Sequence, residues 1–139
     1  MKIGFTFPLP PKELSPNARL HHFPKAAAIR TYRAAVGFLS ADKVAASLTF
    51  GTWKRFLAEN PRLRLTETYR IAGRRKRDVR NLFAAFKAGE DGLVDAGLLP
   101  GDDDSVLEHG APRIERVKTK AEEGVLVEIE EIACHLQRG

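Results

Sequence analysis

The strictest constraint on the fold comes from an alternating stretch between residues 62 and 71. Its apolar positions are Leu63, Leu65, Tyr69 and Ile71, and the positions between them include Arg64, Thr66, Thr68 and Arg70. Successive side chains of a β-strand point to opposite faces, so this period predicts a strand with one apolar and one arginine-rich face. Such a strand requires a sheet with a core on one side.

Further stretches have the composition or the alternation of strands. They are Lys2–Phe7, a segment near Val106, the stretch from Arg113 to Lys118, and the stretch from Gly124 to Ile132. Apolar and polar residues alternate in the first and the last of them, as they do in a half-buried strand. We expect the last two stretches to pair as a hairpin across Thr119–Glu123.

Two other segments carry apolar residues at helical spacing. The stripe of the first is Ile29, Tyr32, Val36 and Leu39, and the stripe of the second is Leu82, Phe83, Phe86, Leu93 and Val94. Pro24 suits the first turn of one helix, and Asp78 can cap the other. We expect Gly89 and Gly92 to weaken the middle of the second helix, which must end by the turn at 97–101. Residues 40–60 fit neither period, and the sequence leaves them unassigned.

Together these elements predict a small mixed α/β domain that spans residues 1–139. A twisted mixed sheet would pack against two main helices, near residues 24–39 and 79–97. A chain of 139 residues, 43% of them hydrophobic, is long enough for one core and too short for two comfortable domains.

Several classes of protein are disfavoured by what the chain lacks. No apolar run approaches the ~20 residues of a membrane span, and no secretory stretch follows Met1, so we expect a cytoplasmic protein without membrane contact. Cys134 has no second cysteine with which to form an internal disulfide. The four histidines, at positions 21, 22, 109 and 135, lack the spacing of a zinc finger.

The net charge of +5 hides an asymmetry between the two halves of the chain. Residues 1–70 hold 12 Lys/Arg against 4 Asp/Glu, a net of +8, and residues 71–139 hold 11 against 14, a net of −3. The densest basic cluster, Arg74 to Arg77, nevertheless lies in the acidic half. A basic surface beside concentrated carboxylates suits a protein that carries a metal ion to a polyanion, although a merely solubilising surface has the same charge.

Four aspartates are candidate metal ligands. Asp78 precedes the second helix, and Asp102, Asp103 and Asp104 follow the turn after it. Mg²⁺ prefers such oxygen ligands, and in nucleases it polarises the scissile phosphate and lowers the pKa of the attacking water. Taken alone, however, three aspartates after Pro-Gly also suit a solvated turn, and Asp78 suits a plain helix cap.

The order of these motifs along the chain is informative. It runs from Arg74-Arg75-Lys76-Arg77-Asp78-Val79-Arg80-Asn81 through Lys87 and Asp91-Gly92-Leu93-Val94-Asp95-Ala96-Gly97 to Asp102-Asp103. This set resembles the RusA family of Holliday junction resolvases, especially its phage-type members. Near the N-terminus, Pro10-Pro11, Ser15-Pro16-Asn17 and Tyr32-Arg33 are similar to the family's proline-rich entry, asparagine loop and first helix.

The resemblance implies a fold, an activity and a set of site residues. The implied protein is a homodimeric, Mg²⁺-dependent endonuclease, with Mn²⁺ as a substitute, that resolves four-way DNA junctions by paired nicks in recombination and repair. Its setting would be a bacterial or phage-infected cell. The implied catalytic residues are Asp78, Lys87 and Asp103, and the implied metal ligands are Asp78 and Asp103 with Asp102 or Asp91. The expected DNA contacts are Arg64, Arg70, Arg74, Arg75, Lys76, Arg77, Arg80 and Asn81.

One departure from the family pattern leaves alternatives open. Arg80 occupies the position of the second aspartate in Asp-x-Asp-Asn, and a guanidinium cannot ligate Mg²⁺. Arg80 could point toward DNA while other carboxylates hold the metal, or it could leave a protein that cuts slowly or binds junctions without cutting. Outside nucleic-acid chemistry, the same basic run would suit a small module that contacts an acidic protein.

Overall fold

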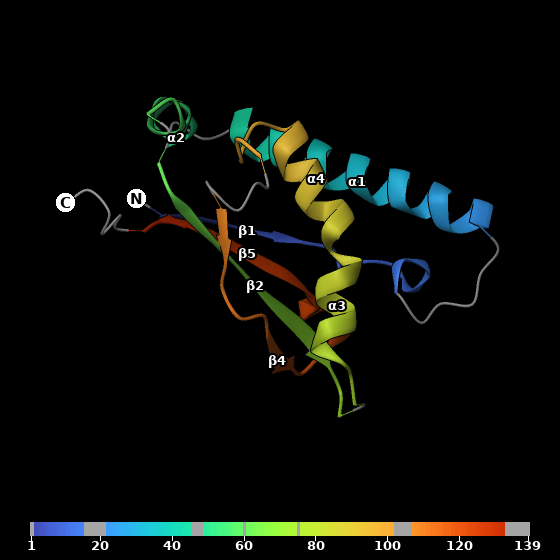
Figure 1. The fold of residues 1–139 in the computed structure, drawn as a ribbon. Coiled ribbons are helices and arrows are strands. Elements are labelled where there is room, and N and C mark those ends of the chain that lie inside the picture. Colours follow the sequence, from blue (N-terminus) through green and yellow to red (C-terminus); the bar gives the residue numbers. More distant parts are fainter. Residues whose placement is uncertain are drawn as a thin grey trace.

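The computed structural model describes residues 2–15, 22–45, 49–59, 61–74, 76–101 and 107–132. The strands in these residues are β1 (Lys2–Phe7), β2 (Leu63–Ala72), β3 (Leu107–His109), β4 (Arg113–Val117) and β5 (Gly124–Glu131). The α-helices are α1 (His22–Ala45), α2 (Thr49–Leu57), α3 (Val79–Ala85) and α4 (Lys87–Asp95), and the short 3₁₀ helices are η1 (Lys12–Leu14) and η2 (Lys120–Glu122). Figure 1 shows their arrangement. The predicted mixed α/β fold is confirmed.

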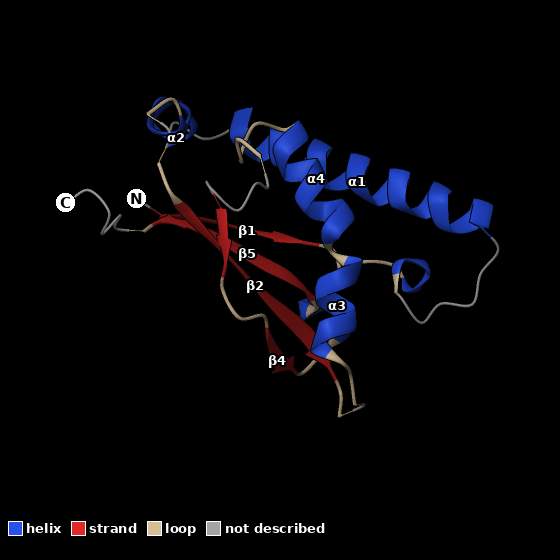
Figure 2. Ribbon diagram, in the orientation of Figure 1, coloured by secondary structure: helices blue, strands red, loops and turns tan. Residues whose placement is uncertain are grey.

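β2 is the central strand of a mixed five-stranded sheet. The order is β1-β5-β2-β3, with β1–β5 and β5–β2 antiparallel and β2–β3 parallel. β4 also pairs in parallel with β2, beyond β3 on the same edge, where Thr68 is opposite Arg113. The helices pack against this sheet, with α3 and α4 following one another in nearly the same direction (Figure 2).

The alternation that predicts β2 corresponds to its two faces. Leu63, Leu65, Tyr69 and Ile71 are each at most 2% exposed. These side chains form a core with strand residues such as Val127 and helix residues such as Phe86. The intervening arginines are half-buried on the other face. Burial of the apolar side chains contributes the main favourable free energy of such a core.

The predicted hairpin between the last two strands is wrong. β4 and β5 both pair with β2, one along each of its edges, so they are not neighbours. The connection through η2 passes the end of β2, where the Ala72 amide donates a hydrogen bond to the Glu123 carboxylate at 2.8 Å. Because β5 forms its ladders with β1 and β2, both of its edges are occupied.

Both predicted helical regions are present but differ in extent. α1 begins at His22 and runs on to Ala45, and α2 fills part of the stretch that the sequence left unassigned. The second region is divided at Phe86, which ends α3 and begins α4. The Phe86 ring is fully buried, and a Cβ at Gly89 would lie 2.6 Å from it. Gly89 therefore makes room for this ring rather than only weakening the helix.

α1 and α4 approach each other closely. A Cβ at Gly92 would lie 2.6 Å from the backbone oxygen of Arg33 and 3.0 Å from the backbone nitrogen of Gly37. Glycine is the residue that permits two helix backbones to approach so closely. No helix in the described part of the chain is long and apolar enough to cross a membrane.

Candidate nucleic-acid interface

Asp78 caps α3, as the sequence predicts. Its backbone is extended, and its carboxylate Oδ1 accepts a 2.8 Å hydrogen bond from the Arg80 amide. An N-cap side chain of this kind satisfies one of the amides that the first turn leaves without a helical partner. The carboxylate is exposed, and its second oxygen is not part of the capping bond.

A groove of about 590 Å³ opens beside this cap, between the segment that follows β1 and helix α3. Its lining residues are Pro10, Pro11, Lys12, Ser15, Lys76, Arg77, Asp78, Asn81, Leu82 and Ala85. Lys12, Lys76 and Arg77 are exposed and bring three positive charges to the groove. Among the described residues, the groove thus brings together one carboxylate and three cations.

Further exposed cations are close in sequence to the groove residues. Arg74 and Arg80 are exposed in the loop before α3 and in its first turn, whereas Arg75 lies outside the described residues. Arg64 and Arg70 are already paired on the sheet. Arg64 lies 3.4 Å from a Glu108 oxygen and 4.0 Å from a Glu130 oxygen. Arg70 lies 3.6 Å from a Glu115 oxygen. Glutamates on neighbouring strands therefore offset the charge of these two arginines.

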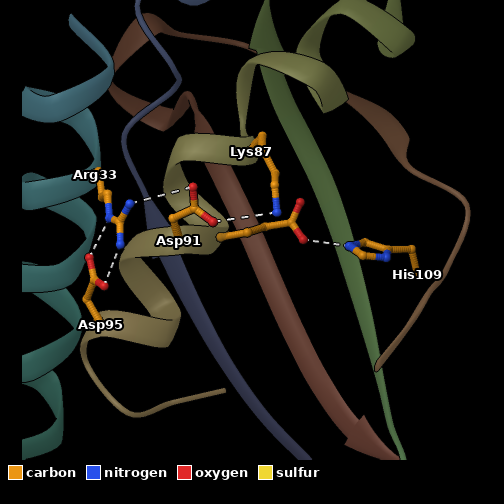
Figure 3. A network of polar contacts seen from close by, with 6 residues as sticks. Arg33, Lys87, Asp91, Asp95 and His109 are labelled. Carbon is orange, nitrogen blue, oxygen red and sulfur yellow. Dashed lines mark hydrogen bonds and ion pairs between the residues drawn. The ribbon is translucent and has the colours of Figure 1, made fainter. Parts of the chain in front are cut away.

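Lys87 belongs to a separate polar network on α4, shown in Figure 3. Its Nζ lies 3.5 Å from Asp91 Oδ1, and Asp91 Oδ2 lies 3.9 Å from the guanidinium of Arg33. Arg33 donates two further hydrogen bonds to Asp95, at 2.7 and 2.8 Å. These bonds lower the pKa of Asp95. Asp91, expected as a metal ligand, is thus in contact with two cations.

A second carboxylate on α4 is buried against the sheet. Glu90 is 3% exposed, and its Oε1 lies 2.5 Å from Nε2 of His109 on β3. The His109 ring also meets Phe83 edge-on, with ring centroids 5.6 Å apart. This contact ties the first turn of α4, which carries Lys87, to the edge strand of the sheet.

Glu67 on β2 lies close to this pair. It is 1% exposed and accepts a hydrogen bond from the Tyr69 hydroxyl, while its other oxygen has no partner among the described residues. Burial, together with the nearby charge of Glu90, raises the pKa of Glu67 from 4.5 to about 8. Desolvation disfavours the charged carboxylate, so Glu67 keeps its proton at neutral pH.

The structure therefore distributes the expected site residues over two places. Asp78, Lys76, Arg77 and Asn81 share the groove, and Lys87 lies with Asp91 on α4. Lys87 is nine positions after Asp78, beyond the break at Phe86 that divides α3 from α4. Among the described residues, no three His, Cys, Asp or Glu side chains are placed to hold a metal ion. Asp102, Asp103 and Asp104 lie outside the described residues, so their pairing with Asp78 stays a prediction.

Some residues of these sites were not expected from the sequence. Lys12 enters the groove because η1 follows the prolines directly, and a local pattern does not reveal which distant segment it will face. Glu67 had a visible signal, because a glutamate occupies an apolar position of the β2 alternation. Glu90 and His109 carried no comparable signal, since their contact joins residues far apart in the sequence.

The comparisons with known proteins add no family to these observations. A scan against models of protein families finds none that matches this chain, and a search of curated proteins finds no match.

Proposed function

We propose that this protein is a metal-dependent endonuclease that cuts branched DNA, with the four-way junction as its substrate, in the manner of the RusA family. The observation that carries the proposal is the groove beside α3, where Asp78 lies among Lys12, Lys76 and Arg77. Cations bind a phosphodiester backbone, and a carboxylate can hold the divalent metal that assists its hydrolysis. The groove offers both kinds of group.

The donor chemistry of Asp78 fits Mg²⁺. This ion is usually held by one or two carboxylates together with substrate phosphate, and Asp78 has one carboxylate oxygen outside its capping bond. Asp103, with Asp102, is the proposed second source of ligands. When bound, the metal would polarise the scissile phosphate and activate the attacking water.

Lys87 would act from the first turn of α4, outside the residues that line the groove. Its side chain is 56% exposed, and its contact with Asp91 holds it on the first turn of α4. An ammonium group presented in this way stabilises negative charge that develops on a phosphate. A homodimer would place two equivalent sites on a two-fold symmetric junction, which permits paired nicks.

A catalytically silent junction-binding protein is the second candidate, and Arg80 favours it. Arg80 directly follows the Asp78–Val79 pair and is exposed, so its positive charge lies near the carboxylate that would hold the cation. The positive charge of Arg80 repels a metal cation at Asp78, whereas the same charge favours the binding of DNA.

The test is cleavage of a labelled mobile four-way junction by the purified protein with Mg²⁺, beside linear duplex of the same sequence. We expect paired nicks in the junction only. Asp78→Asn should abolish them while the protein stays folded, because asparagine also caps helices. Asp103→Asn tests the second proposed ligand in the same assay. Equal cutting of duplex and junction would contradict the proposed substrate.

Arg80→Asp separates the two candidates. If the wild-type protein binds junctions without cutting them and the Arg80→Asp variant cuts them, the wild-type protein is a catalytically silent junction-binding protein. If the wild-type protein neither binds nor cuts junctions but binds an acidic protein, both nucleic-acid proposals fail.

A further inference from the structure

The groove beside α3 has apolar walls as well as charged ones. Pro10 and Pro11 form one wall, and Leu82 and Ala85 of α3 contribute to the opposite one. A phosphate chain alone requires cations and hydrogen-bond donors, and it gains nothing from apolar walls. The groove is therefore suited to a ligand with an apolar part and an anionic part.

Both walls are held in place by the fold. The Tyr32 hydroxyl donates a 2.6 Å hydrogen bond to the Pro8 carbonyl, and the Leu14 amide donates a 3.0 Å bond to the Pro11 carbonyl. Leu14 itself is buried in the core and anchors η1. On the other wall, the Leu82 amide donates to the Asp78 carbonyl in the first turn of α3. A groove with fixed walls binds a ligand without an ordering cost of its own.

The groove also contains polar groups that can bind a nucleotide. The half-buried Asn81 brings an amide, which both donates and accepts hydrogen bonds and so matches the edge of a base. Lys12, Lys76 and Arg77 supply charge for the flanking phosphates. A volume of about 590 Å³ lies within the range of small-ligand pockets.

We propose that this groove binds one unpaired nucleotide of a DNA strand, with the base between the prolines and α3 and its phosphates on Lys12, Lys76 and Arg77. The inference rests on the proposed function for the origin of that nucleotide, which is the branch point of a junction. A base inside a duplex is paired and stacked on both sides and cannot enter a groove, whereas an unpaired base does so at a much lower free-energy cost. The groove thereby distinguishes branched from linear DNA.

The decisive experiment compares two short single strands in a fluorescence anisotropy titration of the full-length protein. One is a labelled hexathymidylate, and the other is the same strand with an abasic site at each inner position. Apolar burial of a base against the prolines and α3 predicts about tenfold tighter binding of the strand that keeps its bases. Equal affinity would show that the groove recognises phosphates only and would overturn the proposal.

Variants place the contact in the groove. Asn81→Ala should reduce the preference for the strand with bases, and Lys76→Ala with Arg77→Ala should weaken binding of both strands. The matched control is Lys118→Ala with Lys120→Ala, which removes the same charge from an exposed segment outside the groove. If Asn81→Ala leaves the base preference unchanged, the base lies elsewhere and the proposal is wrong.

The outcome is separable from that of the proposed function. A protein that prefers strands with bases but never cuts junctions would retain this nucleotide site and lose the endonuclease proposal. A protein that cuts junctions but binds both strands equally would retain the endonuclease proposal and lose the nucleotide site.

Discussion

Burial beside a second carboxylate raises the pKa of a carboxyl group, so the group stays protonated at pH values at which it would be charged in water. Glu67 is in this position, with Tyr69 donating to it and Glu90 nearby. The alternation of β2 correctly indicates that position 67 faces the core. It does not indicate that Glu90 of α4 lies near Glu67. The charge of Glu90 helps to raise the pKa of Glu67.

Glu67→Gln should raise the free energy of unfolding above that of the wild type, and the difference should grow as the pH rises. Between pH 4.5 and about 8 the folded chain holds a proton on Glu67 that the unfolded chain has released. The wild-type free energy of unfolding therefore falls across this window, by up to about 1.4 kcal/mol per pH unit. Glutamine keeps the acceptor for Tyr69 and does not titrate. Urea denaturation of both proteins from pH 5 to pH 8 measures the difference, and the exposed Glu59→Gln serves as the control. Parallel pH profiles would show that Glu67 ionises normally.

At the level of elements, the packing of α1 on α4 depends on small residues and one ion-pair network. Gly92 lies against the α1 backbone, and Arg33 holds Asp95 by two hydrogen bonds at the same crossing. The exposed ion pair adds little because solvent screens it, so the close approach of the two backbones is the feature that sets this contact.

Gly92→Ala should destabilise the fold by about 1–3 kcal/mol, the usual cost of overpacking a close contact. The new Cβ would lie 2.6 Å from the Arg33 carbonyl oxygen, which is backbone and can move only with the whole helix. Gly101→Ala is the matched control, because a Cβ there meets nothing within 4 Å. Thermal unfolding of both variants provides the measurement, and an equal melting temperature for the two would contradict the role of Gly92.

The sequence predicts most elements and fails where tertiary contacts decide. Strands such as β1, the Asp78 cap and most of the helix stripes follow from local sequence, but Ile29 of the first stripe is 39% exposed. The break at Phe86 depends on the burial of its ring against the core, and the separation of β4 from β5 depends on β2 lying between them. Local patterns contain neither of these facts.

At the scale of the whole molecule, the sequence predicts how many positive charges the protein has. It does not predict which of them are paired with glutamates and which line the groove. Arg64 and Arg70 look equivalent to Lys76 and Arg77 in a list of basic residues. In the fold, the first two contact glutamates on adjacent strands, and the last two line the groove. The candidate interface is accordingly narrower than the basic composition indicates.

This distribution predicts the salt dependence of DNA binding. Replacing both Lys76 and Arg77 by alanine should lower the slope of log K against log salt by about 2, since each phosphate contact contributes about 0.9. Replacing Arg64 and Arg70 together should leave the slope nearly unchanged, because glutamates already balance them. Junction binding measured by anisotropy at several salt concentrations distinguishes the pairs. A larger loss from the second pair would move the interface to the sheet.

The position of β5 between β1 and β2 also governs when this chain can fold during synthesis. β1 is made first, but its only strand neighbour in the described sheet ends at Glu131, so its apolar side chains stay uncovered while the intervening residues emerge. At ordinary translation rates this delay is on the order of ten seconds. Ribosome-bound chains that end before Gly124 should therefore remain sensitive to protease, and chains that expose all of β5 should become resistant. The protein is expected to depend on chaperones during this interval.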